Sequence, residues 1–525
     1  MRRSGYKFLC LLMLTCGVRV YSQQPVQGIP SGKITIASIP SINPLLKRLD
    51  VNPVLCIKIY VPAAKPSVNY RQIHGSINTE GVKALDKLEV FFNGAEPLFS
   101  TKNKIASISP TGKVFSIPID IKVEPGWNYI WLSATIREHA SSDSKIEVRA
   151  IQLTDADSRS FAITEQKVSY SKYTGIALRK TGDDSVNTYR IPGITTTDKG
   201  TLIAVYDIRY KNDRDLPANI DVGINRSTDG GKTWEPMKNI MDMGAPHENN
   251  GVGDPAILFD PVAKKVWVAA LWSKGNRSIA GSEPGLSPDT TGQFVLVSSD
   301  DDGITWSQPV SITSQVKNPI WHLYFNGPGN GIAMQDGKLV FASQYWDESK
   351  KPGIPHSSII YSEDHGKTWK SGIGAKSNTT ESQVVETTPG TLMLNMRDNR
   401  GSFRSVATTT DMGVSWIEHP TSFHALPDPV CMASIIKAKV SVKGKLKDVL
   451  FFSNVNSSTV RKDMTIKASL DLGETWLPVN QLLIDERKCY GYSALTKIDD
   501  NTIGLIYEGN KELYFVRIPV KDIIK

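Results

Sequence analysis

One short turn-like pattern occurs five times between residues 227 and 476 of this 525-residue chain. The copies are STDGGKTW at 227–234, SDDDGITW at 299–306, SEDHGKTW at 362–369, TTDMGVSW at 409–416 and SLDLGETW at 469–476. Each copy has a hydroxyl residue, Asp, Gly, a second hydroxyl residue and Trp at the same offsets. This composition suits a β-hairpin turn, because Asp accepts hydrogen bonds from the backbone ahead of it and Gly adopts positive φ.

The spacing of the copies indicates the architecture. Successive copies begin 47 to 72 residues apart, which leaves room for one four-stranded unit per copy. A series of such units is typical of a β-propeller. Strand-like runs dominate from Tyr173 onward, and we expect LYFVRIPV at 513–520 to pair with GIALRK at 175–180. That pairing would close the ring and remove its exposed strand edges.

Residues 33–154 carry strand-like runs without the repeated turn. The contrast predicts a domain boundary in the polar stretch 155–172, with an N-terminal β-sandwich at 23–160 and the propeller at 170–525. Trp127, Tyr129 and Trp131 could stack on a glycan or fill a core. The N-terminal domain is therefore expected to be either a carbohydrate-binding module or a structural support.

The first 22 residues have the composition of a secretory signal peptide. Arg2, Arg3 and Lys7 precede an apolar run at 8–18, and residues 20–22 resemble a small-residue cleavage site. The run is too short to span a bilayer, and no transmembrane segment is expected elsewhere. We therefore expect export to the periplasm, the cell surface or the medium.

Charge and cysteine content exclude several other functions. The formal net charge of +8 falls to about +4 when the four basic residues of the signal are removed, so nucleic-acid binding is not expected. Cys56, Cys431 and Cys489 remain, too few and too scattered for a disulfide framework or a zinc site, and we expect buried thiols. Phosphate loops and dinucleotide fingerprints are also missing from the sequence, so neither a metal nor a cofactor is expected.

The string YRIPGI at 189–194, followed by the five turns, resembles the bacterial sialidases (neuraminidases) of glycoside hydrolase family 33. The resemblance covers roughly residues 173–525 and implies an all-β fold with a six-bladed propeller. It implies that the five turns, known in the family as Asp boxes, are scaffold on the face away from the active site. A second Arg-Ile-Pro lies in the closing strand, so we expect Arg190 in the site and Arg517 in the scaffold.

The resemblance also implies a site for a carboxylate. Sialic acids carry a carboxylate on the anomeric carbon, and arginine offers planar paired donors for such a group. The three arginines of the family correspond to Arg190, to Arg397 in GTLMLNMRDNRG and to Arg461 in STVRKDMTIKAS, although the last two could also be solvated surface residues.

Three further positions follow from the same resemblance. Glu508 in GLIYEG corresponds to the acidic residue that holds the first arginine. Asp254 in GVGDPA corresponds to a residue that contacts the sugar or shapes its pocket. Either Glu508 or Asp254 could instead satisfy backbone groups. Arg209 in YDIRY is assigned to the substrate site.

The substrate carboxylate would repel an anionic nucleophile, and sialidases are known to use tyrosine instead. By resemblance, Tyr492 in YGYSALT is the nucleophile, Glu381 in ESQVVE is its base, and Asp215 in RDLP is the general acid. Neighbouring residues of the same types could be confused with these three. They are Tyr490, Glu386, Asp213 and Asp221.

The sequence thus predicts a retaining exo-α-sialidase that removes terminal sialic acid from glycoproteins, glycolipids or oligosaccharides, as a monomer or weak oligomer. One alternative is a trans-sialidase or an intramolecular trans-sialidase, which would share the same residues. Another is a propeller lectin that binds sialic acid without turnover, and the presence of Tyr492, Glu381 and Asp215 together argues against it.

Overall fold

The computed structural model describes residues 32–165 and 171–525. The expected signal peptide, residues 1–22, lies outside the described residues. Strands β1 to β39 dominate, and the α-helices found in the two described ranges, α1 (Thr79–Ala84), α2 (Thr313–Val316) and α3 (Val520–Ile523), have only four to six residues. Within those ranges no helix has the length and apolar character needed to cross a membrane. The fold is therefore all-β.

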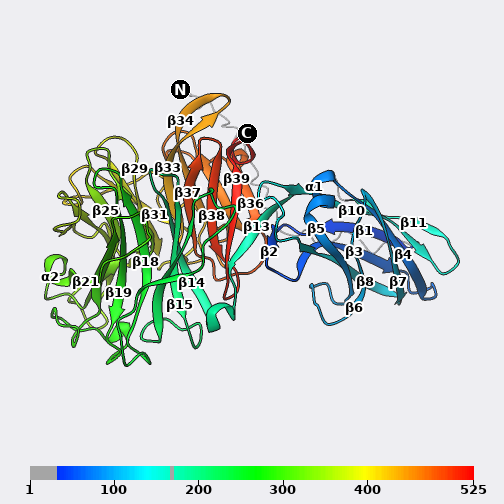
Figure 1. Ribbon diagram of the computed structural model, residues 1–525, viewed down its shortest axis with the longest axis horizontal. Coiled ribbons are helices and arrows are strands. Elements are labelled where there is room, and N and C mark those ends of the chain that lie inside the picture. Colours follow the sequence, from blue (N-terminus) through cyan, green and yellow to red (C-terminus); the bar gives the residue numbers. More distant parts are fainter. Residues whose placement is uncertain (1–31, 166–170) are drawn as a thin grey trace, which may run out of the picture.

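The first part of the chain forms two sheets around one core (Figure 1). The strand orders are β12-β1-β3-β8-β5-β6 and β11-β10-β4-β7. Burial along β7 alternates at every position, the period of a strand with one face on a core. The strands are β1 (Thr35–Pro40), β3 (Asn52–Val61), β4 (Val68–Ile77), β5 (Leu85–Phe92), β6 (Lys104–Ile108), β7 (Val114–Val123), β8 (Gly126–Ile136), β10 (Val148–Asp155), β11 (Ser160–Ala162) and β12 (Thr164–Glu165).

The three aromatic residues of β8 lie outside the core that these two sheets share. Trp127, Tyr129 and Trp131 alternate with buried residues of the same strand and point to its other face. The Trp127 ring packs against Tyr60 at 5.0 Å and lies under Lys58 Nζ at 3.9 Å. Packing between the two sheets is therefore not the role of these rings.

Six sheets follow one another in the remaining residues. We number them in chain order. Sheet 1 is β14 (Thr188–Thr196), β15 (Leu202–Arg209), β16 (Ile220–Ser227) and β17 (Lys238–Met241); sheet 2 is β18 (Gly251–Asp260), β19 (Lys265–Ser273), β20 (Gln293–Ser299), β21 (Val310–Ser311) and β23 (Gly329–Asn330); sheet 3 is β22 (Leu323–Asn326), β24 (Ile332–Ala333), β25 (Leu339–Trp346), β26 (Pro355–Ser362), β27 (Lys370–Ser371) and β28 (Lys376–Ser377).

Sheet 4 is β29 (Thr379–Glu386), β30 (Leu392–Asp398), β31 (Ser405–Thr409) and β32 (Ile417–Glu418); sheet 5 is β33 (Ser434–Val442), β34 (Lys445–Val455), β35 (Met464–Ser469) and β36 (Gln481–Asp485). Sheet 6 is β37 (Ser493–Asp499), β38 (Thr502–Glu508), β39 (Leu513–Pro519) and β13 (Lys172–Arg179), with β2 (Leu45–Lys47) and β9 (Lys145–Ile146) also paired to β13. Residue contacts connect each sheet to the next, and β37 of sheet 6 to β14 of sheet 1.

Sheet 6 joins distant parts of the sequence. Gly175 of β13 lies opposite Val516 of β39, so the predicted pairing of 175–180 with 513–520 is confirmed. The third and fourth strands of this sheet therefore have no turn between them. Each of the five repeated turns joins the third and fourth strands of one of the other sheets, which explains why five turns accompany six sheets.

The five turns share one hydrogen-bond pattern that accounts for their repeated residues. In the first, Gly231 N donates to Ser227 Oγ at 2.8 Å, and Ser227 Oγ and Thr233 Oγ1 donate to Asp229 at 2.8 and 2.7 Å. The same bonds recur in the other four copies. Gly231 has a φ of +84°, which a residue with a Cβ rarely adopts.

Arg517 lies where the six sheets meet the first part of the chain. Its Nε donates to Asp143 at 2.7 Å, and its Nη1 donates to the Gly230 carbonyl in the first turn. Arg517 is thus a scaffold contact, as predicted. Of the three cysteines, Cys56 and Cys431 are buried free thiols as expected, and Cys489 is only half-buried.

Candidate active site

Six of the nine predicted site residues lie on strands and three lie in loops between strands, and all nine form one connected network across five of the six sheets. In three sheets, the first strand in chain order is irregular where it carries a site residue. Register shifts occur in β14 after Arg190, in β18 around Asp254 and in β29 around Glu381. Such bulges bend a strand and redirect its side chains. The backbone irregularities therefore turn these three side chains into the site.

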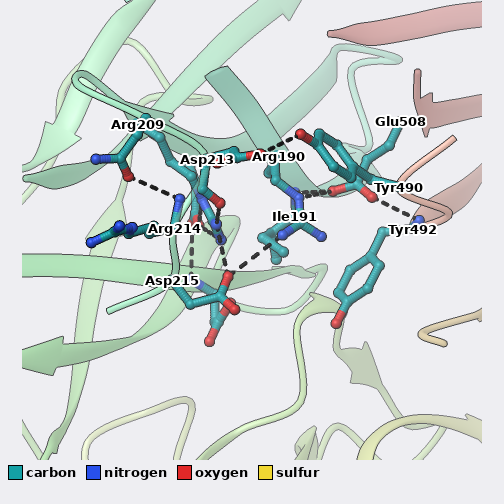
Figure 2. A network of polar contacts seen from close by, with 12 residues as sticks. Arg190, Ile191, Arg209, Asp213, Arg214, Asp215, Tyr490, Tyr492 and Glu508 are labelled. Carbon is teal, nitrogen blue, oxygen red and sulfur yellow. Dashed lines mark hydrogen bonds and ion pairs between the residues drawn. The ribbon is translucent and has the colours of Figure 1, made fainter. Parts of the chain in front are cut away.

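Arg190 is held by Glu508, as predicted. Glu508 is fully buried, and its Oε1 accepts from Arg190 Nε at 3.1 Å and from Ile191 N at 3.0 Å. Its Oε2 accepts from Tyr492 N at 2.9 Å. Burial acts to lower the pKa of Arg190, but the Glu508 carboxylate together with Tyr492 and Asp215 outweighs it, and the pKa lies above its ordinary value. Glu508 therefore fixes both the arginine and the loop that carries Tyr492 (Figure 2).

Tyr492, Glu381 and Arg397 form a compact group. The Tyr492 hydroxyl lies 2.5 Å from both carboxylate oxygens of Glu381. Arg397 Nη1 donates to Glu381 Oε2 at 2.7 Å and to the Tyr492 hydroxyl oxygen at 3.1 Å. Burial, together with the Glu381 charge, raises the pKa of Tyr492 well above its ordinary value. The phenol is therefore neutral at rest, with an acceptor for its proton in contact.

Arg461 lies beside this group and is held by backbone. Its Nη1 donates to the Tyr490 carbonyl and its Nη2 to the Val430 carbonyl, both at 2.9 Å. The guanidinium lies 5.9 Å from the centre of the Tyr492 ring. Arg190 lies 5.4 Å from the same ring centre, so both arginines flank Tyr492.

Asp215 lies in the loop after β15, with 77% of its side-chain surface exposed. Its Oδ1 accepts from Arg209 Nη1 at 2.7 Å and lies 3.5 Å from Arg190 Nη1. Desolvation by neighbouring groups acts to raise the pKa of Asp215, but Arg209 and then Arg190 outweigh it and hold the pKa below its ordinary value. Asp215 is therefore ionised in this structure near neutral pH.

Asp207 is a buried member of the network that the sequence reasoning missed. It accepts from Arg209 Nη2 at 2.8 Å and from Asp254 N at 2.9 Å, so it joins sheets 1 and 2 below the site. Its position in the string YDIRY, two residues before Arg209, was the available signal. Burial and then the Asp207 charge raise the pKa of Asp254 well above its ordinary value.

The four neighbouring residues of similar type have other partners. Glu386 accepts from Gln335 N and Gly390 N, both at 2.9 Å, and Asp221 accepts from Tyr210 and Asn239. These two residues lie outside the network. Tyr490 and Asp213 bond to each other at the edge of the site at 2.7 Å. Among the residues that the structure covers, no cluster of three or more His, Cys, Asp or Glu side chains could hold a metal ion.

Comparisons with known proteins agree on one family. Residues 200–506 match the family model of a BNR repeat-like domain, and residues 31–158 match the N-terminal domain of BNR-repeat neuraminidase. A sialidase of Bacteroides fragilis is 45% identical over 82% of this chain and 80% of its own length. A sialidase of Micromonospora viridifaciens is 33% identical over 64% of this chain and 52% of its own length.

Solved structures give the same answer. The Hadza microbial sialidase Hz136 superposes with a TM-score of 0.85 at 38% identity, over 93% of this chain and all of that one. The intramolecular trans-sialidase of Ruminococcus gnavus shares the fold. It superposes with a TM-score of 0.56 at 19% identity, over 65% of this chain and 96% of its own. On the family match, the relatives and the shared structure, the chain belongs to the BNR-repeat sialidases.

Proposed function

We propose that this sialidase is a retaining exo-α-sialidase and that its six sheets are the blades of a β-propeller. The observation that carries the mechanism is the contact of the Tyr492 hydroxyl with both oxygens of Glu381, at 2.5 Å, with Arg397 bonded to both groups. A tyrosine beside a carboxylate base is an activated nucleophile that a negatively charged substrate does not repel. The substrate class is sialylated glycans, which is what family membership implies.

The three arginines would bind the substrate carboxylate. In the described part of the chain, Nη2 of Arg190 and Nη2 of Arg397 have no hydrogen-bond acceptor, and Arg397 Nε is buried without a partner. These donors lie on either side of Tyr492, whose ring Arg461 also flanks. A carboxylate that bridges them would hold the anomeric carbon next to the tyrosine hydroxyl.

Tyr492 would attack the anomeric carbon while its proton passes to Glu381. The raised pKa of Tyr492 means that bond formation and proton transfer occur together, because a free phenolate is not populated beforehand. Arg397 would stabilise the charge that moves between the two oxygens. The product of this step is a glycosyl-tyrosine, and its hydrolysis by water gives overall retention.

Asp215 would protonate the leaving oxygen and then activate water. A general acid must carry a proton, whereas Arg209 and Arg190 keep the free Asp215 ionised. A bound substrate carboxylate would neutralise Arg190, which lies 3.5 Å from Asp215. That neutralisation weakens the electrostatic effect of Arg190, which is one of the causes of the lowered pKa of Asp215. Substrate binding itself would thus bring the acid closer to its working protonation state.

The decisive experiment is hydrolysis of a sialoside by the purified protein, followed by NMR. Early release of α-configured free sialic acid is expected. A transferred sialoside would indicate a trans-sialidase, and an anhydro sugar would indicate an intramolecular trans-sialidase. Absence of turnover over a wide pH range would leave only a sialic-acid-binding lectin.

For residues 23–160 we propose a β-sandwich that binds glycans through the outer face of β8. Trp127, Tyr129 and Trp131 lie outside the shared core, which supports a surface role for Trp127 and Tyr129. Trp131 packs on Phe99 at 5.5 Å with its indole nitrogen buried. Full-length protein inactivated by Tyr492→Phe would be tested on a glycan array. Equal binding by the same protein carrying Trp127→Ala and Tyr129→Ala would favour a purely structural module.

Export through residues 1–22 completes the proposal. The basic, apolar and small-residue segments in that order support it. N-terminal sequencing of protein recovered from outside the cytoplasm is expected to begin near Gln23. A mature protein that still begins at Met1 would contradict cleavage.

A further inference from the structure

Tyr490 and Asp213 connect the two loops that carry Tyr492 and Asp215. The Tyr490 hydroxyl donates to Asp213 Oδ2 at 2.7 Å, across 277 positions of sequence (Figure 2). Tyr490 lies two positions before Tyr492, and Asp213 lies two positions before Asp215. The bond therefore links the segment of the proposed nucleophile to the segment of the proposed acid. The mechanism above uses neither residue.

Tyr490 is firmly held on its own side. Its N donates to the Gly509 carbonyl at 3.1 Å, and its carbonyl accepts from Arg461 Nη1 at 2.9 Å. Gly491, which follows, has a φ of +102°, and a Cβ there would lie 2.8 Å from Cys431 Sγ. This turn brings both tyrosine rings against Arg190, whose guanidinium lies 4.7 Å from the Tyr490 ring centre. The backbone hydrogen bonds and the packing of the ring on Arg190 therefore hold Tyr490 in place.

Asp213 belongs to a segment with little packing of its own. Residues 211–215 are all exposed, and they lie between β15 and β16. Arg209 Nη1 donates both to the Asp213 carbonyl at 2.8 Å and to Asp215 Oδ1 at 2.7 Å. Leu216, which follows Asp215, is buried in an apolar cluster with Leu271 and Leu323, so packing anchors that end of the segment. Residues 211–215 themselves are held by polar contacts. The bond from Tyr490 ties this segment to the loop that precedes β37 of sheet 6.

We propose that Tyr490 and Asp213 form a clasp that positions Asp215 for protonation of the leaving group, and that the clasp thereby determines how well the enzyme cleaves substrates with poor leaving groups. The proposal rests on the proposed role of Asp215 as the general acid. Tyr490 and Asp213 are positioning residues, because they act on the reaction through Asp215.

Leaving-group chemistry separates this role from general support of the fold. The alcohol of a natural glycan is a strongly basic leaving group and needs a proton as the bond breaks. An aryl alcohol such as methylumbelliferone departs as a stable anion and needs little help from an acid. A misplaced Asp215 would therefore slow cleavage of the first substrate far more than the second. Damage to the fold as a whole would slow both equally.

The test uses the full-length protein and compares kcat/KM for sialyllactose and for methylumbelliferyl sialoside. This parameter reports the steps up to the first bond cleavage, where the acid acts. Tyr490→Phe keeps the ring over Arg190 and removes only the hydroxyl. Loss of a hydrogen bond to a charged group predicts a fall of roughly 10-fold for sialyllactose, with a change below about two-fold for the aryl substrate.

Two further variants and a control complete the design. Asp213→Ala is expected to reproduce the Tyr490→Phe effect, and the double variant should fall within about two-fold of either single one, because both break the same bond. Asp213→Asn retains an amide oxygen that can accept from Tyr490, so it should recover part of the loss. Tyr514→Phe is the matched control, since its hydroxyl donates to Glu512 at 2.6 Å and to no residue of the site.

Two outcomes would overturn the clasp while the proposed function stands. The first is an unchanged ratio of the two kcat/KM values in Tyr490→Phe, whether both values fall equally or neither falls. The second is independent effects that multiply in the double variant. A wild-type protein that cleaves neither substrate would instead remove the proposed function, and the clasp with it.

Discussion

Replacement of Glu508 by Gln probes the link between stability and the site. The side chain is fully buried and accepts three hydrogen bonds, from Arg190 Nε, Ile191 N and Tyr492 N, at 2.9 to 3.1 Å. A glutamine keeps the size of the side chain but removes its charge. Its NH₂ group takes the place either of Oε1, which accepts from Arg190 Nε and Ile191 N, or of Oε2, which accepts from Tyr492 N. Arg190 then loses its buried counter-charge, and one backbone N–H loses its acceptor.

The expected cost follows from these contacts. Removal of one partner of a buried ion pair destabilises a protein by about 3 kcal/mol or more, and for a chain of this size that is a fall in Tm of roughly 3 °C. The effect on catalysis is expected to be larger. Displacement of Arg190 or Tyr492 by about 1 Å would reduce kcat/KM roughly 100-fold.

Glu386→Gln is the matched control. Glu386 is also a buried glutamate that accepts two backbone N–H bonds, but it has no arginine partner and lies outside the site network. Thermal unfolding and kcat/KM on an aryl sialoside would be measured for both variants. We expect a smaller loss of Tm in Glu386→Gln, which breaks no ion pair, and a loss of activity in Glu508→Gln alone. Wild-type kcat/KM in Glu508→Gln, or an equal fall in Glu386→Gln, would refute the reasoning.

Three other outcomes are expected. Tyr492→Phe should lower kcat by roughly 1,000-fold or more and leave the unfolding curve in place; substantial turnover would exclude Tyr492 as the nucleophile. Binding of a 2,3-unsaturated sialic acid analogue at pH 5 should be accompanied by proton uptake, because it raises the depressed pKa of Asp215. Calorimetry in buffers of different ionisation enthalpy should detect this uptake in the wild type and not in Asp215→Asn. Burial lowers the pKa of Lys467 to about 7, so between pH 7 and pH 10 the unfolded chain binds more protons than the folded one, and the stability of the wild type rises with pH across that window. Lys467→Met should remove this rise and stabilise the protein at pH 7 by roughly 1 to 4 kcal/mol. A variant whose stability changes with pH in parallel with the wild type would contradict this account.

Short motifs were sufficient to identify nine residues that the fold brings into one network. Arg190 and Tyr492 are about 300 positions apart, yet each lies in a string whose residue types match one chemical task. The repeated turns were equally informative about the scaffold, because their Ser, Asp, Gly and Thr each make a specific hydrogen bond within eight residues. Local chemistry of this kind is readable from sequence because few other residues can perform it.

Other features depend on contacts between distant strands. Asp207 lies two residues before Arg209, but its bond to the backbone of Asp254 exists only where sheets 1 and 2 meet, and its role was therefore overlooked. The bulges at Arg190, Asp254 and Glu381 are equally invisible in sequence, because an extra residue in a strand is defined by its partner strand. Likewise, Trp127 could be assigned to the outer face of β8 only after the structure showed which alternate residues of that strand are buried.

The pairing of β13 with β39 has a consequence for the order of events during synthesis. Residues 513–519 are made last among the strands, and sheet 6 lacks its third strand until they have emerged. Glu508 lies in that same sheet and holds both Arg190 and Tyr492. A nascent chain can therefore form sheets 1 to 5 without being an enzyme. During refolding, the return of activity is expected to report the completion of sheet 6, because Glu508 of that sheet holds Arg190 and Tyr492.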